Sequence, residues 1–135
     1  MELHTNLGHI LIVDDDELIR DYLMMRLERE GYSCAFAADG LEAVQELRDH
    51  ATPDVILLDL NMPGMDGMEF LRLAKQHIGP AFGVIAMSGD RGPRLKEQVT
   101  RYGALTLIEK PIDFPKLLKL IRVQIEYRKT RAHLA

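Results

Sequence analysis

Five short apolar runs recur along the chain at nearly regular intervals. They lie at Ile10–Val13, Cys34–Ala37, Val55–Leu58, Val84–Met87 and Leu105–Ile108. Most of the runs are continuous rather than alternating, which is typical of strands that are buried on both faces in a parallel sheet. The pattern therefore predicts five buried strands.

Helical periodicity fills the stretches between these runs. Ile19, Leu23 and Leu27 recur at intervals of four residues, and a glycine at position 31 follows as a stop signal. Four further patterns lie at residues 41–47, 68–74, 93–102 and 114–125. Asp66 is the expected N-cap of the third helix. Strand and helix thus alternate five times, which predicts an open α/β sheet with helices on both faces.

The composition fits a single soluble domain. The chain has 135 residues, of which 47% are hydrophobic and 28% charged, and a chain of this length folds without disulfides or a structural metal. Its one cysteine excludes an internal disulfide and fits a reducing compartment. We find no signal peptide and no membrane-spanning run, so we expect one cytoplasmic domain over residues 1–135.

The net charge of −4 is unevenly distributed. From Asp113 to the end there are six Lys/Arg and two Asp/Glu, against 11 and 19 in the rest of the chain. An acidic body with a basic last helix, at about residues 113–131, does not look like a nucleic-acid binder, whose basic face usually dominates the domain. We interpret the basic segment as a solvated helix face. The alternative is a linker or contact helix for a partner or a downstream domain.

Polar residues follow four of the predicted strands. They are Asp14 to Asp16 after the first strand, Asp59 after the third, Ser88 and Gly89 after the fourth, and Lys110 and Pro111 after the fifth. The carboxyl ends of parallel strands meet at one edge of a sheet, where α/β folds bind ligands. We therefore expect carboxylates, a hydroxyl and an ammonium group in one shallow site.

Carboxylates gathered in this way require a compensating cation. Two carboxylates about 4 Å apart repel each other by about 4 kcal/mol at an effective dielectric constant near 20, so three cannot all stay ionised unaided. Oxygen ligands are those that Mg²⁺ prefers. The five histidines and the lone cysteine are too scattered for a softer metal, and the pattern therefore favours Mg²⁺.

These residue types suit phosphoryl transfer. A carboxylate such as Asp59 beside a metal can attack phosphorus and form an aspartyl phosphate. Mg²⁺ and the Lys110 ammonium would neutralise the phosphoryl group, and the Ser88 hydroxyl would donate a hydrogen bond to a third oxygen. Taken singly, each residue also fits an ordinary loop, cap or turn. Their joint position at the strand ends favours the functional interpretation.

Four stretches of the chain resemble the receiver domains of response regulators in two-component signalling. They are residues 10–16 (ILIVDDD), 53–67 (PDVILLDLNMPGMDG), 84–89 (VIAMSG) and 109–111 (EKP). The resemblance covers a core of about residues 8–125. It implies a doubly wound, flavodoxin-like (βα)5 fold with a parallel five-stranded sheet in the order 2-1-3-4-5.

The resemblance assigns the acidic residues to phosphoryl acceptance and metal binding. Asp59 would be the phospho-acceptor. Asp14 and Asp15 would form the acidic pair that binds Mg²⁺, with Asp15 the more direct ligand. Asp59 and the backbone carbonyl of Asn61 would complete the ligand set. The implied function is Mg²⁺-dependent acceptance of a phosphoryl group from a phospho-histidine donor, by a signalling domain that catalyses only its own phosphorylation and dephosphorylation.

Further residues would contact the phosphoryl group or tune its lifetime. Ser88 and Lys110 would contact it, and the peptide bond between Lys110 and Pro111 is expected to be cis. Asn61 and Asp90, two residues after the acceptor and two after the hydroxyl residue, would flank the path of the hydrolytic water. In the family this amide-plus-acid combination implies a short-lived phosphoryl group.

One position departs from the family pattern. The residue three before the lysine is usually aromatic and changes orientation on phosphorylation, but here it is Leu107. We expect phosphorylation itself to be unaffected and the switching of the output face to depart from the usual mechanism. That face would comprise the fourth helix, the fifth strand and the fifth helix, and would support a homodimer.

The resemblance also implies partners. A sensor histidine kinase or a histidine phosphotransfer protein would supply the phosphoryl group, and an output domain or protein, which the sequence does not identify, would receive the signal. No membrane contact and no direct nucleic-acid binding are expected of this domain.

Two alternatives stay open. One is a phosphate-independent interaction module with a receiver fold, which only Leu107 favours. The other is a Mg²⁺-dependent phosphohydrolase of the haloacid-dehalogenase type. Such an enzyme needs a second aspartate two residues after its nucleophile, and Asn61 occupies that place.

Overall fold

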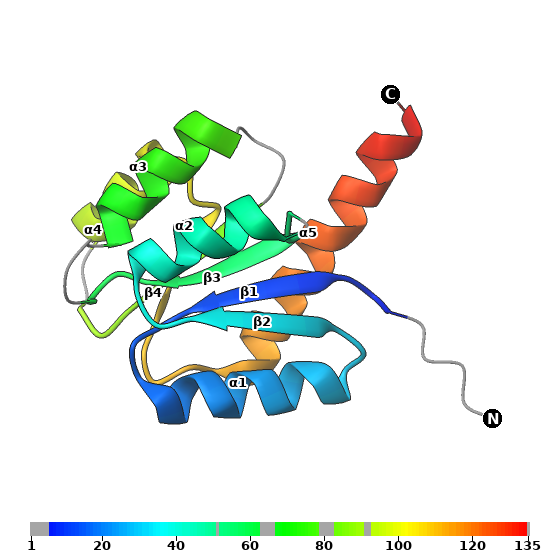
Figure 1. Cartoon of the computed structure of the whole chain (residues 1–135), viewed down its shortest axis with the longest axis horizontal. Helices are drawn as coiled ribbons and strands as arrows, with labels where there is room; N and C mark the ends of the chain where they lie inside the picture. The colour runs from blue at the N-terminus through cyan, green and yellow to red at the C-terminus, as the bar shows by residue number, and fades with distance from the viewer. Residues whose placement is uncertain (1–5, 51, 63–66, 79–82, 91–92, 135) are drawn as a thin grey trace.

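A parallel five-stranded sheet forms the centre of the protein (Figure 1). The computed structural model describes residues 6–50, 52–62, 67–78, 83–90 and 93–134. The strands are β1 (His9–Val13), β2 (Ser33–Ala37), β3 (Val55–Asp59), β4 (Gly83–Ser88) and β5 (Thr106–Glu109). They are arranged in the order β2-β1-β3-β4-β5, and every neighbouring pair is parallel. The predicted strand order is confirmed.

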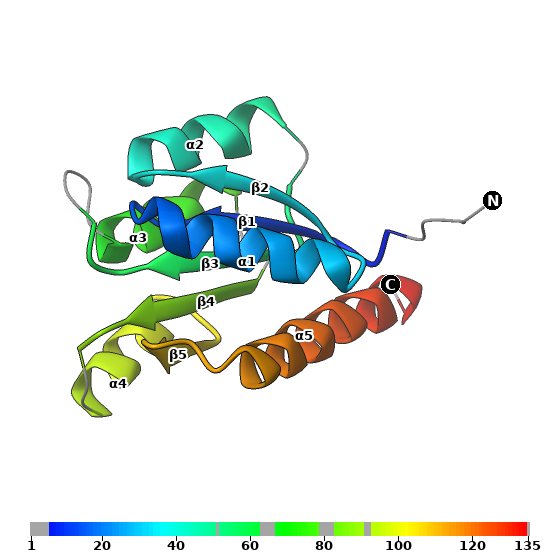
Figure 2. The same cartoon turned by 90° about the horizontal axis from the view of Figure 1, so that it is seen from below.

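A helix follows each strand, and the helices cover both faces of the sheet (Figures 1 and 2). They are α1 (Glu17–Arg29), α2 (Gly40–Asp49), α3 (Gly67–Ile78), α4 (Pro93–Arg101) and α5 (Phe114–Leu134). α1 and α5 pack on one face, and α2, α3 and α4 pack on the other. This is the doubly wound (βα)5 architecture that the sequence predicts.

Side-chain alternation along the strands builds two separate cores. Ile12 of β1 and Leu57 of β3 pack with α1 and α5, whereas Leu11 and Ile56, their immediate neighbours in sequence, pack with α2, α3 and α4. Every residue of β3 and β4 is buried. Both faces of these central strands are covered, which explains their uninterrupted apolar sequences.

The edge strands are less buried than their sequences predict. Ala37 is the buried residue of β2, and Ile108 is that of β5. The side chain of Phe36, on β2, is 52% exposed. Both strands lie at the ends of the sheet, where the helices cover them less completely. The expectation that the strands are buried on both faces is therefore wrong for β2 and β5.

The ends of α1 follow from local chemistry. The Asp16 side chain accepts hydrogen bonds from the backbone N–H groups of Leu18 (3.0 Å) and Ile19 (3.3 Å), as an N-cap does. Past the other end, Gly31 adopts a φ of 102°, which glycine tolerates at little cost. The predicted stop signal is confirmed. The expected N-cap of α3, Asp66, lies outside the described residues.

α5 continues past residue 125, where its apolar periodicity stops, through the basic segment predicted at about residues 113–131, and its C-terminal end projects beyond the sheet (Figure 1). Arg128 ties this extension to the sheet, because its Nη1 donates hydrogen bonds to Asp54 Oδ1 (2.9 Å) and to the Pro53 carbonyl (3.3 Å). Asp54 Oδ2 in turn accepts from the backbone N–H of His9 (2.8 Å). Part of the basic segment is thus a structural anchor rather than a solvated face.

None of the helices in the described part of the chain is both long enough and apolar enough to cross a membrane.

Gly67, the first residue of α3, packs closely against the end of β3. A Cβ atom there would lie 2.7 Å from the Cα of Leu60 and 2.9 Å from the carbonyl oxygen of Asp59. We predict that Gly67→Ala lowers the free energy of unfolding by about 1–3 kcal/mol, because the backbone must shift to admit the methyl group. Urea denaturation measures the change. Gly89→Ala is the control, since a Cβ there meets nothing within 4 Å, and equal losses in both variants would contradict the prediction.

Candidate functional site

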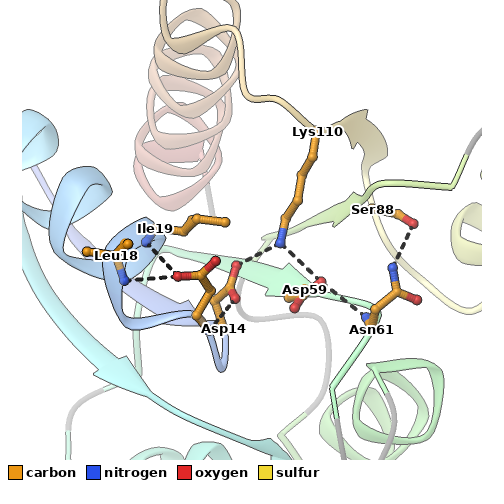
Figure 3. A network of polar contacts seen from close by, with 8 residues as sticks. Asp14, Leu18, Ile19, Asp59, Asn61, Ser88 and Lys110 are labelled. Carbon is orange, nitrogen blue, oxygen red and sulfur yellow. Dashed lines mark hydrogen bonds and ion pairs between the residues drawn. The ribbon is translucent and has the colours of Figure 1, made fainter.

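The polar residues at four strand ends converge on one edge of the sheet (Figure 3). Asp14 follows β1, Asp59 is the last residue of β3, Ser88 is the last residue of β4, and Lys110 follows β5. The parallel order of the strands brings these ends together, as the sequence predicts.

Three carboxylates form an acidic cluster at this edge. Asp14, Asp15 and Asp59 each offer a carboxylate oxygen, and these oxygens all lie within 4.8 Å of one another. Asp14 and Asp59 are buried, with 0% and 2% of their surfaces exposed, whereas Asp15 is exposed. Asp16, the last member of the acidic run, caps α1 instead. An all-oxygen donor set of this kind suits a hard divalent cation.

Lys110 lies between the two buried carboxylates. Its Nζ is 3.0 Å from Asp14 Oδ2 and 3.4 Å from Asp59 Oδ1. Burial on its own would lower the pKa of Lys110, but the hydrogen bonds and charges of Asp14 and Asp59 outweigh burial and raise it. The ammonium group is therefore charged at neutral pH. Among the described residues, Lys110 is the cationic side chain that contacts both Asp14 and Asp59.

One ammonium group does not fully compensate the acidic cluster. Burial, chiefly, and the neighbouring Asp14 charge raise the pKa of Asp59 to about 6, although the Asn61 backbone N–H and Lys110 act in the opposite direction. The Asn61 N–H donates to Asp59 Oδ1 at 3.1 Å. The site thus carries an excess of negative charge, and a divalent cation would relieve it.

Asp14 is held in place through both of its carboxylate oxygens. Oδ1 accepts a hydrogen bond from the backbone N–H of Asp16 (2.9 Å), and Oδ2 accepts one from Lys110 (3.0 Å). The peptide bond between Lys110 and Pro111 is cis, as the resemblance to receiver domains implies.

Ser88 is fully buried and is held by two donors. Its Oγ accepts hydrogen bonds from Asn61 Nδ2 (3.3 Å) and from the backbone N–H of Asp90 (3.0 Å). Asn61 therefore contacts Asp59 through its backbone and Ser88 through its side chain (Figure 3). The sequence implies a backbone carbonyl role for Asn61 and a place beside the water path, but it does not indicate this side-chain contact.

Leu107 is half-buried and packs with the core beneath α2, α3 and α4. It also lines a groove of about 470 Å³ between α4, β5 and the start of α5. The other residues that line this groove are Lys96, Ile108, Glu109, Pro111, Asp113 and Lys116. Leu107 is therefore part of the predicted output face and not of the acidic site.

Comparisons with known proteins agree with this geometry. The family of response regulator receiver domains matches residues 10–122 of this chain. Sporulation initiation phosphotransferase F of Bacillus subtilis is 36% identical over 113 residues, which cover 84% of this chain and 90% of that protein. A CheY-like receiver domain protein from Methanospirillum hungatei superposes with a TM-score of 0.86 at 29% identity, covering 93% of this chain and 99% of that one.

Other relatives are much longer than this chain. The DNA-binding transcriptional regulator NtrC of Escherichia coli is 33% identical over 120 residues, which cover 89% of this chain and 25% of that protein. The sensor histidine kinase RcsC of Salmonella typhi is 33% identical over 124 residues, which cover 91% of this chain and 13% of that protein. Matches of the same stretch in regulators, kinases and a stand-alone phosphotransferase are typical of a signalling module. The fold, the acidic edge of the sheet and these matches together show that the chain belongs to the response regulator receiver domains of two-component systems.

Proposed function

We propose that Asp59 accepts a phosphoryl group from a phospho-histidine donor, with Mg²⁺ bound at the acidic cluster. The observation that carries this proposal is the grouping of buried Asp59 with Asp14, Asp15 and Lys110 at one edge of the sheet. In the reaction a carboxylate oxygen of Asp59 attacks phosphorus, a new O–P bond forms, and the P–N bond to the donor histidine breaks. Such a transfer depends mainly on positioning and charge neutralisation.

The donor set at the acidic cluster fits Mg²⁺. Asp14, Asp15, Asp59 and the backbone carbonyl of Asn61 would hold the ion, and all of them offer oxygen. When bound, Mg²⁺ supplies charge neutralisation to the carboxylates and to the phosphoryl oxygens. The hydrogen bonds from Asp16 and Lys110 orient Asp14, so part of the ligand set is already in position.

Lys110 and Ser88 would contact the phosphoryl group from two sides. The ammonium group of Lys110 already lies 3.4 Å from Asp59 Oδ1 and would neutralise a phosphoryl oxygen. Ser88 would have to release the Asn61 amide before its hydroxyl turns toward the new group. The phosphoryl group adds roughly one to two negative charges. It would bias the loops after β4 and β5 between two arrangements.

A sensor histidine kinase or a histidine phosphotransfer protein would be the donor. The receiving surface would be the α4–β5–α5 face, where Leu107 replaces the aromatic switch residue, and self-association through this face is one output that we infer. The rival hypothesis of a phosphate-independent module rests on Leu107 alone. The buried, lysine-paired carboxylates count against it, because two buried acids are costly to keep without a function.

Asp59 should be the single site of phosphorylation. We predict that the intact protein gains one phosphoryl group from acetyl phosphate only when Mg²⁺ is present, and that Asp59→Asn abolishes the gain because an amide is not a nucleophile here. Intact mass spectrometry measures it. Asp16→Asn is the matched control, since asparagine also caps a helix, and it should be phosphorylated normally. No gain in the folded wild-type protein would favour the phosphate-independent module.

Mg²⁺ binding should weaken in acid. The pKa of Asp59 is raised to about 6, so below that pH the metal must displace a proton, and we predict that the apparent affinity falls by up to about tenfold per pH unit. Calorimetric or NMR titrations with Mg²⁺ at about pH 5 and about pH 7 test this relation. Asp59→Asn should bind more weakly at both values and lose much of the pH dependence. An affinity of the wild-type protein that does not change between them would contradict the raised pKa.

The lifetime of the phosphoryl group should depend on Asn61 and Asp90. Asn61 contacts the Ser88 hydroxyl through its side-chain amide and Asp90 contacts it through its backbone N–H, and we expect both side chains to flank the path of the hydrolytic water. We predict that Asn61→Lys or Asp90→Ala slows dephosphorylation by roughly tenfold, or about 1.4 kcal/mol in the barrier. Decay of the phosphorylated species by mass spectrometry gives the rate. Asp49→Ala, the same change at an exposed position far from the site, is the control. Unchanged decay in both site variants would refute the proposed tuning.

A further inference from the structure

Asp16 ends the loop of the acidic site and caps the start of α1. Its side chain accepts hydrogen bonds from the backbone N–H groups of Leu18 (3.0 Å) and Ile19 (3.3 Å), and its own backbone N–H donates to Asp14 Oδ1 (2.9 Å) (Figure 3). One residue is therefore bonded to a buried carboxylate of the site through its backbone and to the first turn of the helix through its side chain. A change at either place can reach the other through Asp16.

Asp15 is the least firmly held member of the acidic cluster. Its side chain is exposed, and it makes no hydrogen bond or ion pair within the described residues. Asp14, in contrast, is buried and accepts hydrogen bonds at both carboxylate oxygens. The position of the Asp15 carboxylate is therefore set by the backbone of the loop that carries it.

Charge repulsion acts against this position of Asp15. The carboxylate oxygens of Asp14, Asp15 and Asp59 all lie within 4.8 Å of one another, and like charges at such distances repel each other. Asp14 and Asp59 are fixed by burial, so the exposed Asp15 is the member of the cluster that can move away. A constraint on its backbone is needed to keep it beside the other two before a cation binds.

The loop is held on both sides of Asp15. Before it, the Asp14 N–H donates a hydrogen bond to the Ala37 carbonyl of β2 (3.1 Å). After it, the Asp16 backbone is extended (φ −85°, ψ 106°), and its carbonyl accepts the first helical hydrogen bond, from the Arg20 N–H (3.0 Å). The side-chain cap of Asp16 secures this second attachment, because uncapped N–H groups weaken the first turn of a helix. Loss of the cap would therefore loosen the loop next to Asp15.

We propose that Asp16 is a positioning residue for the divalent cation: its cap of α1 holds the Asp15 carboxylate in the acidic cluster and so raises the affinity of the cluster for Mg²⁺. The proposal rests on the proposed function, because it requires that Mg²⁺ binds at this cluster. Asp16 acts through its neighbours and not as a ligand. A ligand that is already in place loses less conformational freedom on binding, which favours affinity. By linkage, the first turn of α1 must become more stable when the cation binds.

Titration of two Asp16 variants with Mg²⁺ at neutral pH, by calorimetry or NMR, separates position from charge. We expect Asp16→Ala to bind Mg²⁺ roughly threefold to fivefold more weakly than the wild-type protein, because the cap is lost. Asp16→Asn should recover most of this affinity, since asparagine caps a helix as well as aspartate does but carries no charge. Equal losses in the two variants would overturn the proposal, because the affinity would then depend on the negative charge and not on the cap.

Asp39→Ala is the matched control for the loss of a cap. Asp39 caps α2 through a hydrogen bond from the Glu42 N–H (2.9 Å) and follows the neighbouring strand β2, outside the acidic cluster. Urea denaturation should show that Asp39→Ala and Asp16→Ala lose similar amounts of stability, whereas the Mg²⁺ affinity should fall in Asp16→Ala alone. A similar fall in both variants would mean a general effect of a weakened helix, and the positioning role would be wrong.

Hydrogen exchange in the wild-type protein gives a readout that needs no variant. Saturation with Mg²⁺ should slow exchange of the Leu18 and Ile19 amides, which Asp16 caps, by roughly the same factor as that by which the cap raises the affinity. The Glu42 amide, which Asp39 caps, is the internal control and should exchange at nearly the same rate with and without Mg²⁺. Exchange at Leu18 and Ile19 that does not respond to bound Mg²⁺ would contradict the coupling.

The wild-type titration separates this proposal from the proposed function. If the folded wild-type protein binds no Mg²⁺, both are overturned. If it binds Mg²⁺ and is phosphorylated on Asp59, but Asp16→Ala binds the ion equally well, the proposed function stands and the positioning role of Asp16 is refuted. A loss in Asp16→Ala that Asp16→Asn restores, with Asp39→Ala unaffected, is the result that we expect.

Discussion

One ammonium group shared by two buried carboxylates is the interaction on which the site depends. Lys110 lies within 3.0 Å of Asp14 and 3.4 Å of Asp59. An unpaired buried charge costs several kcal/mol, so the lysine stabilises both carboxylates in this buried position. The single lysine balances only one of these two charges, and burial, chiefly, together with the Asp14 charge raises the pKa of Asp59 to about 6. The acidic edge of the folded domain is therefore suited to a cation without any rearrangement of Asp14 or Lys110.

The sheet brings these three groups together because they share a side of it. Asp59 continues the alternation of Val55 and Leu57, which face α1 and α5. Asp14 and Lys110 extend the same alternation from Ile12 and Ile108, two residues before each of them. Ser88 instead continues the opposite alternation, that of Val84 and Ala86, toward α2, α3 and α4. The two aspartates and the serine hydroxyl thus continue opposite faces of the sheet. Asn61 links the two sides, because it donates hydrogen bonds to both Asp59 and Ser88.

The sequence was sufficient to predict the central features and insufficient for those that depend on position in the fold. β3 and β4 are buried on both faces, so their apolar runs identify them, and the residues that follow such strands identify the site. Phe36 is just as apolar, but its burial depends on where β2 lies in the sheet, which no local pattern shows. The contact between Asn61 and Ser88 joins residues 27 positions apart and depends on side-chain orientation. Likewise, Arg128 looks like a solvated cation until α5 brings it to Asp54.

Under the proposed function, Leu107 would change how a signal leaves the site. In a receiver with an aromatic ring at this position, movement of the hydroxyl residue would be matched by movement of the ring. Leu107 is small enough to stay packed beneath α4. The end of β5 also stays bonded to β4, because the Lys110 N–H donates a hydrogen bond to the Ser88 carbonyl (2.9 Å).

The described contact between Ser88 and the segment before α4 is made by Asp90. The Asp90 N–H donates to Ser88 Oγ, so rotation of the Ser88 side chain must either carry this loop along or break its hydrogen bond. Asp90 lies three residues before α4 in the sequence, so either event would occur close to the start of that helix. Under the proposed function, this contact would favour a signal that leaves the site toward α4, with β5 as a fixed support.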